Sequence, residues 1–263
     1  MMHLNICAGG FSIRLRSSDR KVIDRVRLLY ADSVCNQAHQ FTVTLEVRER
    51  FDVSGPRVKL CGGLNGSVDI SRSSALFVIP SDSEYLIKGI FEICFTLICA
   101  SRNALFLHSA GIVIDGRSVI FHGTMGAGKT TVARLSRHCR LLSDEHIIVK
   151  KGGAGCHTAY STHIGGEYFK TRKNLKPNVR SAPVKAIIFL HKSGKDALVR
   201  KTAADAAAEI LKESFFSFGA SPELVSLKKK HLDSVAALVT DVDCYDLYFT
   251  KSQRFWKKIN AVL

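Results

Sequence analysis

The sequence predicts an α/β protein with a mixed sheet, preceded by a small α+β module. The chain has 263 residues, of which 46% are hydrophobic and 23% charged, so it can bury a substantial core in one or two domains. Along the chain, segments whose apolar residues alternate as in a strand are followed by segments with helical periodicity, and the reverse. An apolar hairpin leads directly into a glycine-rich turn that ends in lysine and threonine.

The first 80 residues predict short strands around one helix. The segments expected to be strands are Phe11–Arg16, Phe41–Val47, Val68–Ile70 and Leu76–Ile79. Asp19–Tyr30 carries apolar residues at helical spacing behind an aspartate that can cap the helix. This module shows no pattern of catalytic side chains, and we interpret residues 1–80 as a structural or substrate-binding module and 81–263 as a second, larger domain that contains the glycine-rich turn.

The second region begins with a helix expected over Ser81–Ala100. Its apolar core carries Lys88 and Glu92 and is shorter than the roughly 20 residues that span a bilayer, so we expect a buried helix and no membrane association. Strands are expected at Ala104–His108, Gly111–Ile114 and Ser118–His122. The Asp115–Gly116 pair between the last two predicts a tight hairpin.

Helices and strands continue after the glycine-rich turn. A helix is expected to about Arg137, followed by strands within Arg140–Lys150. The polar and basic stretch Lys151–Pro183 predicts a long functional loop. The remaining expectations are a buried strand Val184–His191, a helix Ala203–Phe216, one or two helices in Pro222–Val239, a strand Asp246–Thr250 and a closing helix Ser252–Ile259.

The turn in VIFHGTMGAGKTT matches the phosphate-binding pattern GxxxxGK[ST] without a mismatch. Glycines let backbone N–H groups point at a phosphate, and the following helix start favours negative charge. Lys129 can bridge the β- and γ-phosphates, and the Thr130 hydroxyl can hold Mg²⁺. The predicted nucleotide contacts are Gly123, Thr124, Met125, Gly126, Ala127, Gly128, Lys129, Thr130 and Thr131.

A phosphate cradle also needs a metal partner and a catalytic group. Asp144 and Glu145 follow an apolar strand, and such carboxylates can complete a Mg²⁺ shell or accept a proton, although a solvated turn would look the same. His108 and His122 each end an apolar run, where a histidine is more often structural. Six basic residues are candidates for contact with an anionic substrate or for surface charge: Arg140, Lys170, Arg172, Lys173, Lys176 and Arg180.

Net charge and cysteine content restrict the binding partners and the cellular compartment to be expected. The formal net charge is +15, which attracts anions without choosing among nucleotides, acidic peptides and nucleic acid. A solvated basic face is an equal alternative. No secretory signal is visible, and the eight cysteines include no CxxC pair, so we expect reduced thiols and a cytoplasmic protein.

The segment LHSAGIVIDGRSVIFHGTMGAGKTTVARLSRHCRLLSDEHIIV resembles the catalytic core of HPr kinase/phosphorylase-like proteins, which share a fold with ATP-dependent phosphoenolpyruvate carboxykinase. The resemblance extends more loosely over about two thirds of the chain. It implies that His108 is the catalytic histidine that helps place the phosphoryl group. It further implies that Lys129 is the P-loop lysine, that Thr130 is the Mg²⁺ hydroxyl, and that Glu145, with Asp144 beside it, is the acid/base carboxylate.

The sequence departs from that family at two places. The family's base is usually aspartate, so the longer Glu145 side chain leaves Asp144 as an alternative base. The long glycine-rich signature that holds HPr is absent, and Ser161–Lys170 stands in its place. Glu167 in that segment is a candidate Mg²⁺ ligand, and HPr is not the expected substrate.

We therefore predict an ATP- and Mg²⁺-dependent kinase-like phosphotransferase. Its acceptor would be a hydroxyl, most plausibly of serine, on a protein, a peptide or a small molecule. The alternative is a non-catalytic nucleotide-binding module that docks a partner. Nucleic-acid binding is supported only by the net charge, since no stacking pattern or nucleic-acid motif is present. Relatives are often oligomeric, so a homo-oligomer stays open.

Overall fold

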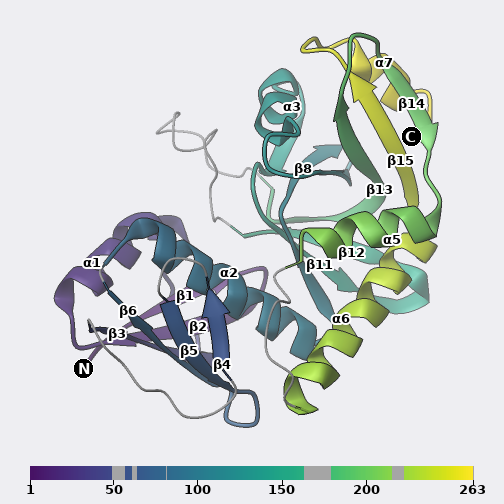
Figure 1. Ribbon diagram of the computed structural model, residues 1–263. Helices are drawn as coiled ribbons and strands as arrows, with labels where there is room; N and C mark the ends of the chain where they lie inside the picture. Colours follow the sequence, from purple (N-terminus) through teal and green to yellow (C-terminus); the bar gives the residue numbers. More distant parts are fainter. Residues whose placement is uncertain (49–56, 61–63, 81, 163–178, 215–221, 263) are drawn as a thin grey trace. The chain divides into compact units, whose positions relative to one another are not determined.

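The computed structural model contains residues 1–263 and describes all of them except 49–56, 61–63, 81, 163–178, 215–221 and 263. The described part is an α/β protein with two mixed sheets, which confirms the predicted fold class (Figure 1). Contacts divide it into two compact units, Met1–Arg102 with Phe215–Lys230, and Asn103–Ser214 with His231–Leu263. We call them the N-terminal unit and the P-loop unit. The domain boundary after residue 80 stays a prediction.

The N-terminal unit contains a six-stranded sheet with the order β1-β2-β3-β6-β5-β4. Strand β3 is parallel to both β2 and β6, and the other neighbours are antiparallel. The sequence indicated β2, β3, β5 and β6 but not β1 or β4. The strands are β1 Met2–Ala8, β2 Phe11–Ser17, β3 Phe41–Val47, β4 Arg57–Leu60, β5 Leu64–Asp69 and β6 Ser74–Ile79.

Two helices, α1 Arg20–Leu29 and α2 Glu84–Ser101, contact each other and this sheet. The predicted cap is confirmed, because the Asp19 side chain accepts a hydrogen bond from the Lys21 N–H group. Helix α2 has twelve buried residues, which confirms the expected buried helix. Among the described residues, no helix is long and apolar enough to cross a membrane.

The expectation of reduced thiols is wrong for two of the eight cysteines, although five others among the described residues are free. Cys7 on β1 and Cys35, just after the short 3-10 helix η1 Ala31–Ser33, form a disulfide across 28 positions of sequence. No local pattern indicates this pairing, because the two cysteines meet only once β1 and the chain after η1 are brought together. That approach is fixed by the Cys35 N–H group, which donates to the Asn5 carbonyl, and by a bridge between Ile6 and Val34.

The P-loop unit contains a nine-stranded sheet. Its main path is β10-β8-β9-β13-β12-β11-β7, and β15 pairs with both β13 and β14. Strands β9, β13 and β15 are parallel to one another, so their carboxyl ends meet at one edge. The strands are β7 Ala104–Leu107, β8 Ser109–Ile114, β9 Arg117–His122, β10 Arg140–Ser143, β11 Ile147–Lys151, β12 His157–Ser161, β13 Ser181–Lys192, β14 Ala197–Arg200 and β15 Asp243–Phe249.

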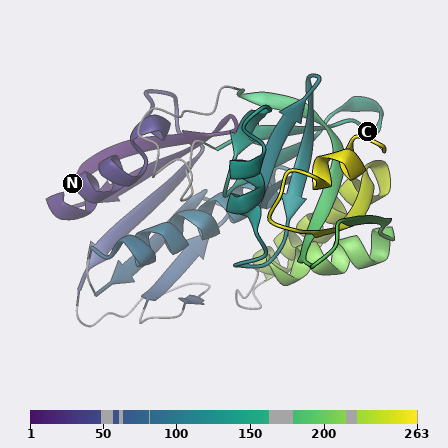
Figure 2. The same ribbon diagram turned by 90° about the horizontal axis from the view of Figure 1, so that it is seen from above.

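Alternate side chains of these strands pack into two separate cores. One core joins Ile120 and Phe189 to helix α5 Ala203–Lys212 and to the second half of α6 Pro222–Asp241. The other joins Phe121 to helix α3 Lys129–Leu135 and helix α7 Phe255–Ile259. Figure 2 shows α3 apart from the neighbouring α5 and α6. The sheet is therefore covered by helices on both faces.

The expected long loop over Lys151–Pro183 is partly wrong. Within it, β12 pairs antiparallel with β11 and with the start of β13, and a short 3-10 turn, η2 Gly153–Gly155, precedes it. The segment HTAYS was not recognised as a strand because two of its three buried residues are polar. Thr158 and Tyr160 alternate with these buried neighbours, but the amino acids do not show the apolar alternation typical of a strand. The rest of the segment, 163–178, lies outside the described residues.

Candidate nucleotide site

The glycine-rich turn joins the end of β9 to the start of α3, as the sequence predicted. Gly126 and Gly128 have positive φ values of 80° and 116°, which favour glycine. A Cβ atom on Gly128 would lie 2.8 Å from Cζ of Phe249, and one on Gly123 would lie 2.8 Å from Cβ of Ala127. The turn is thus a close-packed backbone loop that depends on glycine at these positions.

Lys129 turns back into this loop. Its Nζ atom donates to the carbonyl oxygens of Gly123, at 2.6 Å, and Thr124, at 3.2 Å. Burial lowers the pKa of Lys129, and the carboxylates of Glu213 and Glu145 oppose that shift. Only 7% of the residue is exposed, so the loop holds its ammonium group in place beneath the backbone.

The predicted hairpin before the loop is confirmed. Strands β8 and β9 pair antiparallel from Ile114↔Arg117 to Ser109↔His122. Asp115 and Gly116 both have positive φ, 47° and 76°, as a two-residue type I′ turn requires. The hairpin brings the residue before β8, His108, toward the start of the phosphate loop.

His108 and His122 are both held neutral. Burial, with the nearby charge of Lys129, lowers the pKa of His108 to about 4 and that of His122 to about 3. The His122 Nδ1 atom lies 2.9 Å from the Ser109 hydroxyl, which fixes the ring below the loop. The His108 ring stacks on that of His146, with centroids 5.1 Å apart. A neutral imidazole at His108 can hydrogen-bond a phosphoryl group without adding charge.

Asp144 and Glu145 follow β10, which pairs with β8 on the hairpin. The Ser143 hydroxyl accepts from the N–H groups of Glu145 and His146, both at 3.3 Å, and this holds the chain in a turn. Asp144 is 2% exposed, whereas Glu145 is partly buried. The segment is therefore a fixed element of the fold rather than a solvated turn.

The structure brings together most of the residues that the sequence singled out. His108, Lys129 and Glu145 interact electrostatically, since Lys129 lowers the His108 pKa and Glu145 raises that of Lys129. Thr130 and Thr131 lie partly buried in the first turn of α3, and Thr124 and Met125 are exposed on the loop. Glu167 and the basic residues Lys170 to Lys176 lie outside the described residues.

Sequence reasoning missed Glu213, the C-terminal capping residue of α5. The negative charges of Glu213 and Glu145 both raise the Lys129 pKa, and the effect of Glu213 is the larger. No local pattern marks it, because α5 is an alanine-rich helix whose placement depends on packing of Ala206 and Ile210 in the core. Glu213 thus adds an acidic side chain to the lysine's surroundings.

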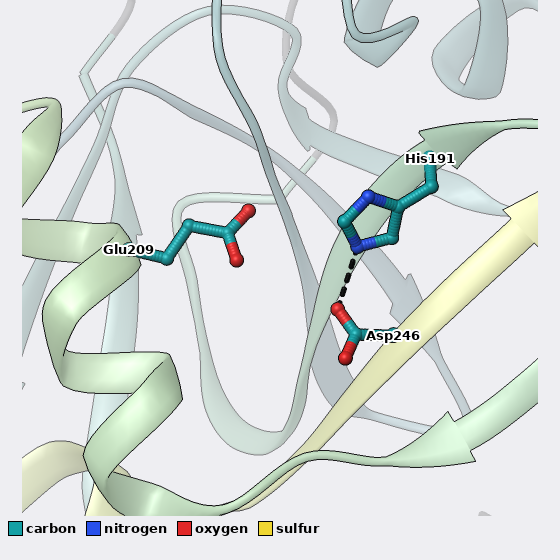
Figure 3. A group of neighbouring side chains, drawn as sticks. All are labelled: His191, Glu209 and Asp246. Atoms are coloured by element: carbon teal, nitrogen blue, oxygen red, sulfur yellow. Dashed lines mark hydrogen bonds and ion pairs between the residues drawn. The ribbon is translucent and has the colours of Figure 1, made fainter.

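A second polar cluster lies one turn back along α5. His191, Glu209 and Asp246 place potential ligand atoms within 4.8 Å of one another (Figure 3). The His191 Nε2 atom lies 2.6 Å from Asp246 Oδ1. The ammonium of Lys201 lies 2.9 Å from both Glu209 Oε2 and Asp246 Oδ1, so a lysine already pairs with the two carboxylates. The cluster joins α5 to β13 and β15 as a charge network.

Comparison with known proteins identifies the family. The family model described as "SynChlorMet cassette protein ScmC" matches residues 81–263. The chain belongs to this family. The match contains the hairpin, the phosphate loop, the acidic pair and α5.

Other comparisons are more distant. One similar solved structure is the Hpr(Ser) kinase/phosphatase from Coxiella burnetii, with 11% identity over 59% of this chain and 97% of that chain, and a TM-score of 0.34. No curated protein matches the chain. Family membership accordingly rests on the family model, and the activity has to be argued from the site.

Proposed function

We propose that the P-loop unit is an ATP- and Mg²⁺-dependent phosphotransferase that moves the γ-phosphoryl group of ATP to a hydroxyl, with serine as the favoured acceptor. The single observation that supports this most is the buried Lys129, held by carbonyls of a close-packed glycine loop within electrostatic range of His108 and Glu145. A loop built only to bind phosphate would not need a carboxylate and a neutral histidine beside the lysine.

The loop fits a nucleotide on two grounds. Gly123 and Gly128 pack against Ala127 and Phe249 with no room for a Cβ atom, and a glycine loop of this kind can turn its backbone N–H groups toward a phosphate. Lys129 supplies a positive charge at a fixed position. A phosphate oxygen can take the place of the carbonyl oxygens that its ammonium group now contacts. Thr130 would hold Mg²⁺ with Asp144, and Glu167 stays a proposed further ligand. The metal, when bound, neutralises charge on the phosphates.

The proposed step balances as follows. The acceptor oxygen forms a bond to the γ-phosphorus while the bond from that phosphorus to the β–γ bridging oxygen breaks, and ADP leaves. The hydroxyl proton passes to a carboxylate, either Asp144 or Glu145. Neutral His108 hydrogen-bonds the transferred group, and Lys129 stabilises negative charge as it shifts to the leaving phosphate.

The test separates binding from transfer. Binding of a fluorescent ATP analogue with Mg²⁺ is compared for wild type, Lys129→Met and the exposed-lysine control Lys195→Met. We expect binding to fall about a hundredfold in Lys129→Met and to stay unchanged in the control, since the lysine contacts phosphate directly. Equal binding by all three proteins would contradict the proposed nucleotide site.

Transfer is then measured with γ-labelled ATP in an extract of the source cells, and label is followed separately in protein and small-molecule fractions. We expect the variant that removes the base, Asp144→Asn or Glu145→Gln, to lose label transfer by about 10² or more while it binds ATP with unchanged Mg²⁺ dependence. A variant that removes a Mg²⁺ ligand should instead need more Mg²⁺ for ATP binding. Glu223→Gln, an exposed carboxylate, is the matched control. If wild type binds ATP but transfers no label, the kinase hypothesis is contradicted and the protein is a non-catalytic nucleotide-binding module.

A further inference from the structure

One face of the N-terminal sheet carries polar and basic side chains. On β1, β2 and β3, alternate residues such as Leu4, Ile13 and Val43 are buried on the side of the helices. Most of the residues between them, on the other side, are partly or fully exposed, whereas Ser12 is buried beneath the segment after η1. We call this second side the open face, and its central residues are His3, Asn5, Arg14, Arg16, Thr42 and Thr44.

Strand register arranges these residues in two rows. His3 lies opposite Arg16, and Arg16 lies opposite Thr44. In the next row, Asn5 lies opposite Arg14, and Arg14 lies opposite Thr42. Each row therefore presents an arginine flanked by neutral or basic hydrogen-bonding groups, and the two arginines are two positions apart on one strand.

A histidine from outside the sheet borders these rows. The segment after η1 crosses the face at Ser12, whose hydroxyl donates to the Ala38 carbonyl at 2.6 Å. His39 in that segment has a lowered pKa, first through partial burial and then through the charges of Arg14, Arg16 and His3. The positive groups thus act on one another across a single patch.

The described residues supply no carboxylate partner to this patch. Arg14 donates to the Asn5 side-chain oxygen at 3.1 Å, and no described ion pair involves Arg16. The acidic residues toward the ends of the face are already engaged, with Glu46 paired to Arg48 at 2.6 Å and Asp69 to Arg72 at 3.5 Å. The central positive charge is left available to a ligand.

We propose that the open face docks an extended acidic segment of a partner protein, with carboxylates at alternate positions. Charge complementarity supports this occupant. Side chains on one face of an extended chain repeat about every 6.6–6.8 Å, which is also the spacing of Arg14 and Arg16 along β2. A segment lying along β2 can place one carboxylate on each arginine, and the Thr42 and Thr44 hydroxyls can hydrogen-bond the same groups.

A nucleic acid fits the open face less well. Sheets that bind single strands stack bases on aromatic side chains, and the described residues of this face include no Phe, Tyr or Trp. The aromatic residues of these strands, such as Phe11, Phe41 and Phe77, are buried in the core instead. The surface does not depend on phosphotransfer, so it can be tested separately from the proposed activity.

The experiment measures fluorescence anisotropy of labelled peptides with the full chain at about 0.15 M salt, where long-range charge effects are screened. The probes are a (Glu-Thr) repeat of about twelve residues and its (Gln-Thr) counterpart. We expect binding of the acidic peptide only, weakened about tenfold in R14Q/R16Q because two charge contacts are lost. The matched control K21Q/R27Q removes two exposed charges from α1 and should change the Kd less than about twofold.

Several outcomes would overturn the proposal. They are no binding of the acidic peptide by wild type, an equal loss in both double variants, and equal binding of the glutamine peptide. A single-stranded oligothymidine that binds more tightly than the peptide and depends on Arg14 and Arg16 would identify a nucleic-acid surface instead. Circular dichroism of each variant checks that the fold is retained, and both substituted pairs lie on exposed or partly exposed positions.

Discussion

The two sheets of this protein are covered by helices to different extents. In the P-loop unit, Phe189 faces α5 and α6 while its neighbour Ile188 faces α3 and α7, so both faces are buried. In the N-terminal unit, helices α1 and α2 pack on the buried side of the strands, and Arg14 and Arg16 stand on the other. A sheet buried on both faces leaves its edge and loops for chemistry, whereas a sheet covered by helices on one side only keeps much of the other face for a partner.

The candidate residues follow this division. Lys129, His108 and Glu145 gather where strands end and loops begin, at the carboxyl edge of β9 and beside the hairpin. The basic groups of the N-terminal unit lie in mid-strand, at Arg14 and Arg16. Stability should therefore be most sensitive to strand side chains in the P-loop unit and least sensitive to the open face of the N-terminal unit.

Truncating core side chains should give the largest effects. Phe189→Ala and Phe121→Ala, on opposite faces of the larger sheet and both fully buried, should each lower the free energy of unfolding by about 3–5 kcal/mol. Arg16→Ala and Thr44→Ala on the open face should change it by less than about 0.5 kcal/mol. Urea unfolding followed by circular dichroism, with hydrogen exchange to resolve the units, measures both. Equal costs in the two sets would contradict the comparison.

Reducing the Cys7–Cys35 disulfide should destabilise the N-terminal unit alone. A cross-link that closes a loop of 28 residues contributes about 3–4 kcal/mol by limiting the unfolded chain. Trp256, the single tryptophan, lies in the P-loop unit, and its fluorescence transition should not move on reduction. Hydrogen exchange of β1 and β2 should rise with dithiothreitol. A Cys7→Ser/Cys35→Ser variant, which has no bond to reduce, should be insensitive to it.

The P-loop unit should lose stability on mild acidification. The pKa is about 4 for His108 and His231 and about 3 for His122, against 6.5 in an unfolded chain. Between pH 6.5 and 4 the unfolded state therefore binds more protons, and the free energy of unfolding falls as pH falls, by up to about 1.4 kcal/mol per pH unit for each histidine.

Urea unfolding at pH 7, 6 and 5, followed by Trp256 fluorescence, measures this dependence. His122→Gln should reduce the slope, and His3→Gln, an exposed position in the other unit, should leave it unchanged. A stability that is flat between pH 7 and 5 would show that the three histidines are not held neutral by burial.

Helix caps should give smaller effects than core truncation or loss of the disulfide, and of similar size in both units. Asp19 caps α1 by accepting from the Lys21 N–H group, and Thr202 caps α5 by accepting from the Asp205 N–H group. Asp19→Ala and Thr202→Ala should each cost about 1 kcal/mol. Asp19→Asn and Thr202→Ser retain a side-chain acceptor and should cost much less. A large difference between the two caps would mean that one helix depends chiefly on packing.

Local spacing was sufficient to predict several of these features. The Asp115–Gly116 hairpin, the Asp19 cap and the glycine loop around Lys129 each depend on a few consecutive residues whose backbone preferences are strong. Burial of α2 followed from its nearly continuous apolar sequence. The strand β12 was missed because two of its buried residues, His157 and Ser161, are polar, so the sequence shows no apolar alternation.

Short-range signals and long-range contacts account for different features of this protein. The phosphate loop, the hairpin and the order of most helices and strands could be predicted from the amino acids, because those signals act within one turn or one strand. Pairing of Cys7 with Cys35, the approach of Glu213 to Lys129, and the exposure of Arg14 and Arg16 on one sheet face depend on contacts between distant segments. Alternation predicts that a strand has two faces, but only packing of α1 and α2 decides which face is covered.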